Sequence, residues 1–257
     1  MPVTRESIID CCVQALQPLS PVRAAFLGGS EAFGRADQWS DIDLVSVGPQ
    51  DQADDVFAAL EERLQALSPI VLKLVMPPSS LWPELSQRFY RLRDTDEFLM
   101  IDFCQVTPGQ LTTFLEPARH GTPVVLFDHD GLIKPVPLES DHDERMHTRL
   151  AWHRAAFPMF QNLARKAVLR GDLVEAIAVY HSHTLRPLVD VLRMLHCPVR
   201  FDYGFRYTSY DLPAQVTANL RELMWPQDGQ DLLAKLERAA TLFSDTVVAI
   251  DAGGDER

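Results

Sequence analysis

The stretch "FLGGSEAFGRADQWSDIDLVSVG", residues 26–48, places two glycines and a serine directly after an apolar run and then two aspartates on either side of one isoleucine. Alternation in "DIDLVSVG" predicts a strand with Asp41 and Asp43 on one face and Ile42 and Leu44 on the other. Two aspartates at this spacing repel each other unless a divalent cation lies between them. The stretch therefore predicts a site that needs paired negative charge.

The residues Gly28, Gly29 and Ser30 predict a loop that opens a short helix, whose free backbone N–H groups can hold phosphate oxygens. Hard carboxylate oxygens such as those of Asp41 and Asp43 are the ligands that Mg²⁺ prefers. Ser30 has two compatible interpretations, because its hydroxyl can bond a phosphate oxygen or cap the short helix. The pattern indicates a phosphate site and a metal site side by side.

A third acid, Asp102, lies in the apolar run "FLMIDFCQV", residues 98–106, which predicts a further strand of the same sheet. An acid among apolar strand residues is costly to keep without a bound cation or a proton to move. We expect Asp102 to complete the carboxylate cluster. The alternative is an ion pair with a nearby cation such as Lys73, on the predicted strand before it.

Around these runs the sequence predicts an α+β fold, in which a small mixed-sheet domain is followed by an all-helical bundle. In the first part we expect helices over about 4–17 and 51–66, strands in 22–28, 69–76 and 123–128, and a turn at Asp130–Gly131, whereas 77–97 gives no clear prediction. The proline-bearing "KPVPLES" suggests a linker, and four long amphipathic segments without strands follow it. The expected division is a domain over 1–137, a helical bundle over 138–250 and a frayed tail over 251–257.

Composition excludes several classes of protein. The 24 basic and 36 acidic residues give a formal net charge of −12, which disfavours nucleic acid and suits a neutral or cationic partner. The four cysteines form no CxxC pair, so we expect a reduced, cytoplasmic protein. No apolar run has the length of a membrane helix, and "MPVTRESIID" lacks the features of a secretory signal.

Residues 26–47, with an apolar residue, Gly-Gly-Ser, about a dozen residues and then Asp-apolar-Asp-apolar, resemble the signature of the nucleotidyltransferase superfamily that includes polymerase beta. In size and order the two expected domains resemble the antibiotic nucleotidyltransferases, which comprise the aminoglycoside and lincosamide adenylyltransferases. The segment "LARKAVLRGDLVEAIAVYHSHTLRPLVDVLRM", residues 163–194, resembles a helix pair of the lincosamide enzymes.

This resemblance implies transfer of a nucleoside monophosphate, usually AMP from MgATP, onto a hydroxyl of a small molecule. It implies two Mg²⁺ ions on Asp41 and Asp43, with Asp102 as a third metal ligand or as the base that deprotonates the acceptor. It also makes Lys166 and Arg186 candidates for contact with the triphosphate, although charged helix residues more often face solvent.

The acceptor expected from the resemblance is an aminoglycoside or a lincosamide, and a cationic acceptor would suit the acidic chain. No nucleic acid or membrane partner is expected, and a homodimer is compatible with the sequence. Two other functions stay open: nucleotide transfer to a protein partner, as in regulators or antitoxins, and a non-catalytic nucleotide-binding role.

Overall fold

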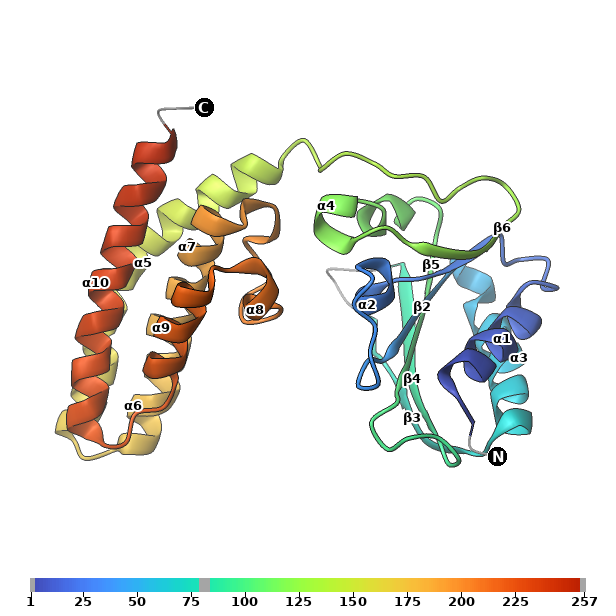
Figure 1. Ribbon diagram of the computed structural model, residues 1–257, viewed down its shortest axis with the longest axis horizontal. Helices are drawn as coiled ribbons and strands as arrows, with labels where there is room; N and C mark the ends of the chain where they lie inside the picture. The colour runs from blue at the N-terminus through green and yellow to red at the C-terminus, as the bar shows by residue number, and fades with distance from the viewer. Residues whose placement is uncertain (1–2, 79–83, 255–257) are drawn as a thin grey trace. The chain divides into compact units, whose positions relative to one another are not determined.

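The computed structural model describes residues 3–78 and 84–254 (Figure 1). It divides into two compact units, Met1–Leu138 and Glu139–Arg257. The first holds a mixed six-stranded sheet with helices and the second is helical, which confirms the predicted α+β class. Within the described ranges, no helix combines the length and the apolar character needed to cross a membrane.

Five of the six strands in the first unit lie within or next to the predicted strand segments, and β4 is the exception. Its helices and strands are α1 (Arg5–Leu16), β1 (Ala24–Leu27), α2 (Gly29–Ala32), β2 (Ile42–Val47), η1 (Gln50–Gln52), α3 (Ala53–Leu67), β3 (Ile70–Val75), β4 (Leu85–Leu92), β5 (Ile101–Val106), η2 (Leu111–Phe114), α4 (Pro117–His120) and β6 (Val124–Asp128). The strand order is β3-β4-β5-β2-β1-β6. Among the described strands only β2 and β5 pair in parallel, and the strand order places them at the centre of the sheet.

The two faces of this sheet are covered differently. Helices α1 and α3 pack on one face, where Ile42 and Leu44 of β2 join a buried apolar cluster with Ile101 and Phe103 of β5. On the other face a smaller cluster, which includes Val45 and residues of η2, covers the later halves of β2 and β5. Because side chains alternate along a strand, the acids near the start of β2 and β5 lie on this second face, which we call the open face.

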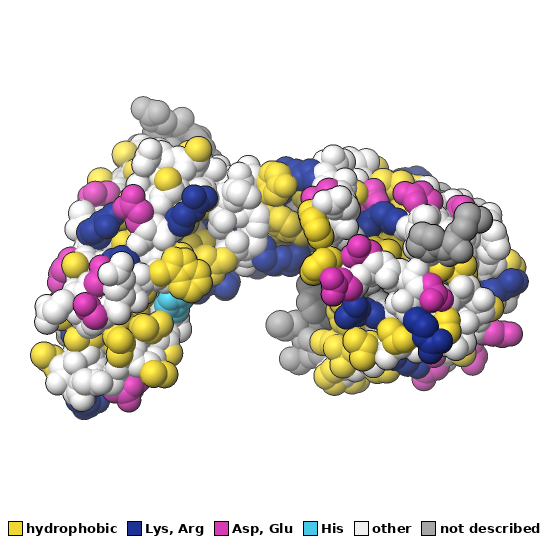
Figure 2. All heavy atoms as spheres, turned by 60° about the horizontal axis from the view of Figure 1, so that its bottom comes forward, with side chains coloured by type: hydrophobic (Ala, Val, Ile, Leu, Met, Phe, Trp, Pro, Cys, Tyr) yellow, Lys and Arg dark blue, Asp and Glu magenta, His cyan; other side chains and the backbone are white. Residues whose placement is uncertain are grey.

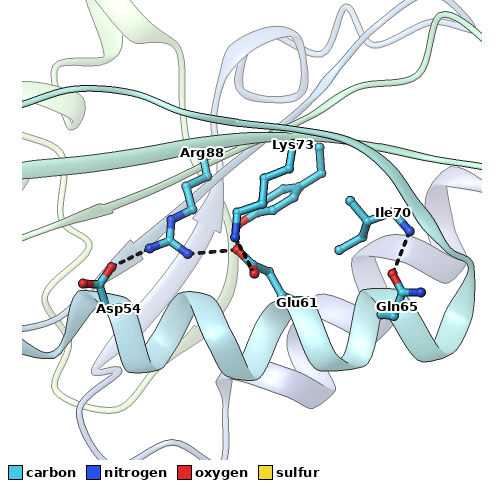
Figure 3. A network of polar contacts seen from close by, with 7 residues as sticks. Asp54, Glu61, Gln65, Ile70, Lys73 and Arg88 are labelled. Carbon is cyan, nitrogen blue, oxygen red and sulfur yellow. Dashed lines mark hydrogen bonds and ion pairs between the residues drawn. The ribbon is translucent and has the colours of Figure 1, made fainter.

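Strand β4 lies in the segment that gave no clear prediction from the sequence. Its polar residues Arg88 and Tyr90 face α3, where both donate hydrogen bonds to Glu61 (Figure 3). The half-buried guanidinium of Arg88 and the Tyr90 hydroxyl thus stand where apolar side chains would have indicated a strand. The sequence of β4 therefore does not predict a strand without knowledge of Glu61, its partner on α3.

The second unit contains no strand among its described residues. Its elements are α5 (His142–Leu169), α6 (Leu173–Tyr180), η3 (His181–Leu185, a π-helical turn), α7 (Arg186–His196), η4 (Pro198–Arg200), α8 (Thr208–Asp211), α9 (Ala214–Met224) and α10 (Gly229–Gly254). The fully buried Arg193 donates to the carbonyl of Gly204 at 2.6 Å and pairs with Asp211 at 2.8 Å, which holds the loop after α7. Helix α10 continues to Gly254, so the predicted tail from residue 251 was wrong for its first four residues, and 255–257 lie outside the described residues.

Candidate active site

Parallel pairing of β2 and β5 brings two of the predicted acids together. Asp43 and Asp102 are direct register partners on these neighbouring strands, so both side chains project from the open face. Asp41 precedes β2 and lies two residues before Asp43, on the same face. The three acids that the sequence singled out therefore share one face of the sheet centre.

Gly28 and Gly29 lie against Asp43. The Gly28 amide donates to the Asp43 carbonyl at 2.8 Å, which fixes the loop after β1 beside β2. Gly29 has φ +52°, and a Cβ added there would come 1.7 Å from Oδ2 of Asp43. Only glycine lets the backbone approach the carboxylate this closely.

Ser30 stands in the first turn of α2, but it does not cap the helix. The N-cap residue is Gly28 and no side chain caps this end. The Ser30 hydroxyl is buried and has no hydrogen-bond partner among the described residues. Because buried hydroxyls normally have partners, this one is free to bond a ligand oxygen, whereas the capping role that the sequence also allowed is absent.

The carboxyl of Asp102 is held in an environment that favours its protonated form. Burial raises its pKa to about 6, and the charges of Asp43 and Asp41 add to this, although the hydrogen bond donated by Gln87 at 2.7 Å acts in the opposite direction. The alternative partner Lys73 pairs instead with Glu61, at 2.7 Å, on the α3 side of the sheet. Asp102 therefore lies on the same face as Asp41 and Asp43 and does not form an ion pair with Lys73.

The open face contains no ready-made cage for a metal ion. Among the described residues, no group of three or more His, Cys, Asp or Glu is arranged to hold one. Mg²⁺ is usually bound by one or two carboxylates together with substrate phosphates and water, so an all-protein cage is not needed. The oxygen chemistry of Asp41 and Asp43, next to the unpartnered Ser30 hydroxyl, fits Mg²⁺ with a phosphate.

One residue that supports the site was not predicted. Arg5 of α1 donates to the carbonyls of Ser40 and Asp41, each at 2.6 Å, and pairs with Glu31 of α2 at 2.8 Å. It therefore joins the start of β2 to the helix that follows Gly29. No local pattern could reveal this role, because the partners lie 26 to 36 residues away in the sequence.

The predicted cations Lys166 and Arg186 both lie in the second unit. Lys166 is exposed on α5, while the Nε of Arg186 on α7 lies 3.2 Å from the buried carboxylate of Asp190. The guanidinium of Arg186 also packs against Gly204, where an added Cβ would come 2.5 Å from its Nη1. Their contact with a triphosphate stays a prediction.

Comparison with known proteins finds similar solved structures only. No protein-family model matches the chain. No curated protein matches it either. An aminoglycoside 6-adenyltransferase from Bacillus subtilis is 11% identical, with a TM-score of 0.36, covering 97% of this chain and 91% of that one. A spectinomycin adenyltransferase, AAD(9), from Enterococcus faecialis, solved with ATP and spectinomycin, is 10% identical, with a TM-score of 0.38, covering 96% and 100%.

Both structures are antibiotic adenyltransferases, the group that the sequence resembles.

Proposed function

We propose that this protein is a Mg²⁺-dependent nucleotidyltransferase that moves a nucleoside monophosphate, AMP from ATP in the first instance, onto a hydroxyl of a small molecule. The observation that carries the proposal is the register of Asp43 with Asp102 on neighbouring parallel strands, with Gly29 in contact with Asp43. The resemblance of residues 26–47 to the superfamily signature supports the same assignment.

In this proposal Asp41 and Asp43 hold Mg²⁺, and Gly28, Gly29 and Ser30 hold the phosphates. Bound Mg²⁺ supplies positive charge that offsets the charge of the phosphates and of the departing pyrophosphate. The backbone of the loop approaches the phosphates because no side chain intervenes at Gly29. The Ser30 hydroxyl, which lacks a partner, donates to a phosphate oxygen.

Asp102 acts as the general base. The acceptor oxygen forms a bond to the α-phosphorus, the bond from that phosphorus to the bridging oxygen breaks, pyrophosphate leaves, and the hydroxyl proton passes to Asp102. A base with a pKa near 6 is mostly ionised at neutral pH and still binds a proton readily, which is the range that acid–base catalysis favours.

The test is transfer by Asp41→Asn and Asp43→Asn, measured as pyrophosphate release from MgATP with a panel of hydroxylated acceptors. Each amide keeps the shape of the carboxylate and loses the charge that binds Mg²⁺, so we expect turnover to fall at least about a hundredfold in each. Asp10→Asn, on an exposed position of α1, is the control and should keep full turnover. Near-normal turnover in either site variant at saturating Mg²⁺ would refute the assignment.

A further inference from the structure

The open face continues past the acids onto β4 and β3. Register pairing places Asp43, Asp102, Phe89 and Leu74 in one row across the four strands β2, β5, β4 and β3. Direct partners in a sheet point to the same side, so the row runs without interruption from the carboxylates to the edge strand. Neighbouring strands are about 4.8 Å apart, which puts Leu74 roughly 14 Å from Asp43.

A second row of side chains lies beside the first on the same face, two residues away on each strand. Arg91 pairs with Leu72 and follows Phe89 by two residues, and on the other side Met100 precedes Asp102 by two. By strand spacing and rise, the Cα of Arg91 is roughly 8 Å from that of Asp102. One arginine therefore stands close to the proposed base, on the same face.

The outer part of this face is apolar and exposed. Leu72, Leu74 and Met76 expose 59%, 57% and 40% of their surface. Trp39 and Phe98, which precede Asp41 and Met100 by two residues each, contact each other with ring centroids 5.2 Å apart. Figure 2, in which hydrophobic side chains are yellow, shows that such side chains reach the surface of the molecule among charged ones. An exposed apolar surface that continues from a candidate catalytic site is typical of a ligand-binding surface.

The acids of the open face, Asp41, Asp43 and Asp102, belong to its centre and not to the part formed by β3 and β4. Neither β3 nor β4 contains an aspartate or a glutamate. Two further acids that contact these strands, Asp54 and Glu61 of α3, lie on the opposite face, where Arg88 and Lys73 pair with them (Figure 3). The net charge of the whole chain therefore does not describe β3 and β4, whose charged residues are all basic.

Arg91 differs from the other arginine of β4. Arg88 is held by Asp54 and Glu61, whereas the Nε of Arg91 is buried and has no hydrogen-bond partner among the described residues. No ion pair to Arg91 occurs within 3–78 and 84–254. A guanidinium in this state is ready to bind a carboxylate or another oxygen group.

We propose that the acceptor of this enzyme is a mainly apolar hydroxylated molecule with an anionic oxygen group, and not a polycation. Its hydroxyl lies at Asp102, its apolar body packs on Phe89, Leu72 and Leu74, and its anionic group binds Arg91. This inference rests on the proposed function, because it takes Asp102 as the reacting end of the site.

Two probes of equal length and opposite charge test the proposal: 10-hydroxydecanoate and 10-amino-1-decanol. Each carries a hydroxyl at one end of a ten-carbon chain, and their binding to the full chain is measured by calorimetry with Mg²⁺ and ATP present. We expect the wild-type protein to bind the carboxylate probe at least about tenfold more tightly. Arg91→Glu should invert this preference and Arg91→Gln should abolish it. Leu74→Ser should weaken the binding of both probes by the same factor.

Arg63→Glu is the matched control, because it makes the same charge change at an exposed position of α3, on the other face. Tighter binding of the ammonium probe by the wild type, or equal effects of Arg91→Glu and Arg63→Glu, would overturn the inference. A dimer that Leu74→Ser dissociates would also overturn it, since a second copy would then cover this face.

The rise in melting temperature with MgATP, measured in the same variants, separates this inference from the proposed function. If MgATP stabilises every variant and the charge preference is absent, the inference fails and the nucleotidyltransferase assignment stands. If MgATP has no effect on the wild type while the charge preference holds, the assignment fails and the anion-binding face stands.

Discussion

At the scale of single residues, Gly29 leaves no room for a side chain beside Asp43. Its positive φ and its contact with the Asp43 carboxylate act together, since either alone would favour glycine. Gly34 has a similar φ of +62° but nothing within 4 Å of an added Cβ. Substitutions at Gly29 and Gly34 therefore distinguish the effect of backbone strain, which both would have, from the effect of a clash with the Asp43 carboxylate, which only Gly29 would have.

We expect Gly29→Ala to abolish the rise in melting temperature with MgATP, because the methyl group displaces the Asp43 side chain. Gly34→Ala should cost only the backbone strain, about 1 kcal/mol of unfolding free energy, and keep the MgATP response. Thermal unfolding with and without MgATP measures both. An equal MgATP response in the two variants would show that the phosphates bind elsewhere.

Asp102 gives a prediction about stability and pH in the absence of metal. Burial raises its pKa from 3.8 to about 6, so the folded protein binds this proton more tightly than the unfolded chain does. The stability that this proton contributes is complete below pH 3.8 and is lost as the pH rises through about 6. Above that pH the charged carboxylate destabilises the first unit.

In EDTA at pH 8 we therefore expect Asp102→Asn to be more stable than the wild type, by about 2 kcal/mol or less. The Asn side chain keeps the hydrogen bond from Gln87 and removes the charge. The advantage should disappear near pH 4, as urea unfolding across this range would show. A difference that does not change with pH would mean that the titration of Asp102 is not its cause.

At the scale of elements, Arg5 joins α1 to α2 and to the start of β2. Its side chain is 16% exposed, and its three hydrogen bonds go to groups that flank the site. Charge-assisted hydrogen bonds of a mostly buried arginine contribute more than a surface ion pair does. Arg5 is thus a positioning residue for the loop that carries Gly29 and for Asp41.

We expect Arg5→Gln to lower the unfolding free energy by about 1–3 kcal/mol and to raise the KM for MgATP several-fold with a smaller effect on kcat. Arg23→Gln is the control, because it breaks an exposed pair with Asp130 far from α2. It should leave the KM unchanged. Equal effects of the two variants on the KM would mean that Arg5 stabilises the fold without positioning the site.

At the scale of the whole molecule, the chain consists of two units with separate cores. The candidate acids belong to the first unit and the candidate triphosphate cations to the second. Lys166 has a close neighbour for comparison, because Arg165 on the same helix is occupied by an ion pair with Glu237.

We expect Lys166→Ala and Arg186→Ala each to raise the KM for MgATP about tenfold, since a hydrogen bond to a charged group contributes about 1.5 kcal/mol or more and about 1.4 kcal/mol is a factor of ten. Arg165→Ala should leave the KM unchanged, and circular dichroism should show that all three variants are folded. If Lys166→Ala and Arg186→Ala behave like Arg165→Ala, the helical unit does not contribute cations to the triphosphate.

The sequence by itself determined the parts of the site that depend on neighbours along the chain. Asp41 and Asp43 share a face because side chains alternate along a strand, and a short helix begins at Gly29 as the glycine pair indicates. The strands around these residues follow from their apolar runs. Strand β4 could not be predicted, because Arg88 and Tyr90 bury polar groups against Glu61 of α3.

Only the tertiary structure decided which distant residues meet. The register of Asp43 with Asp102, the contact of Gly29 with the Asp43 carboxylate and the bonds of Arg5 all join separate segments. The same holds for Arg91, whose place on the open face depends on how β4 pairs with β5 and β3. The physical reason is that a one-residue shift in strand pairing moves every side chain to the other face, and hydrogen bonds between distant strands, not local preference, set that register.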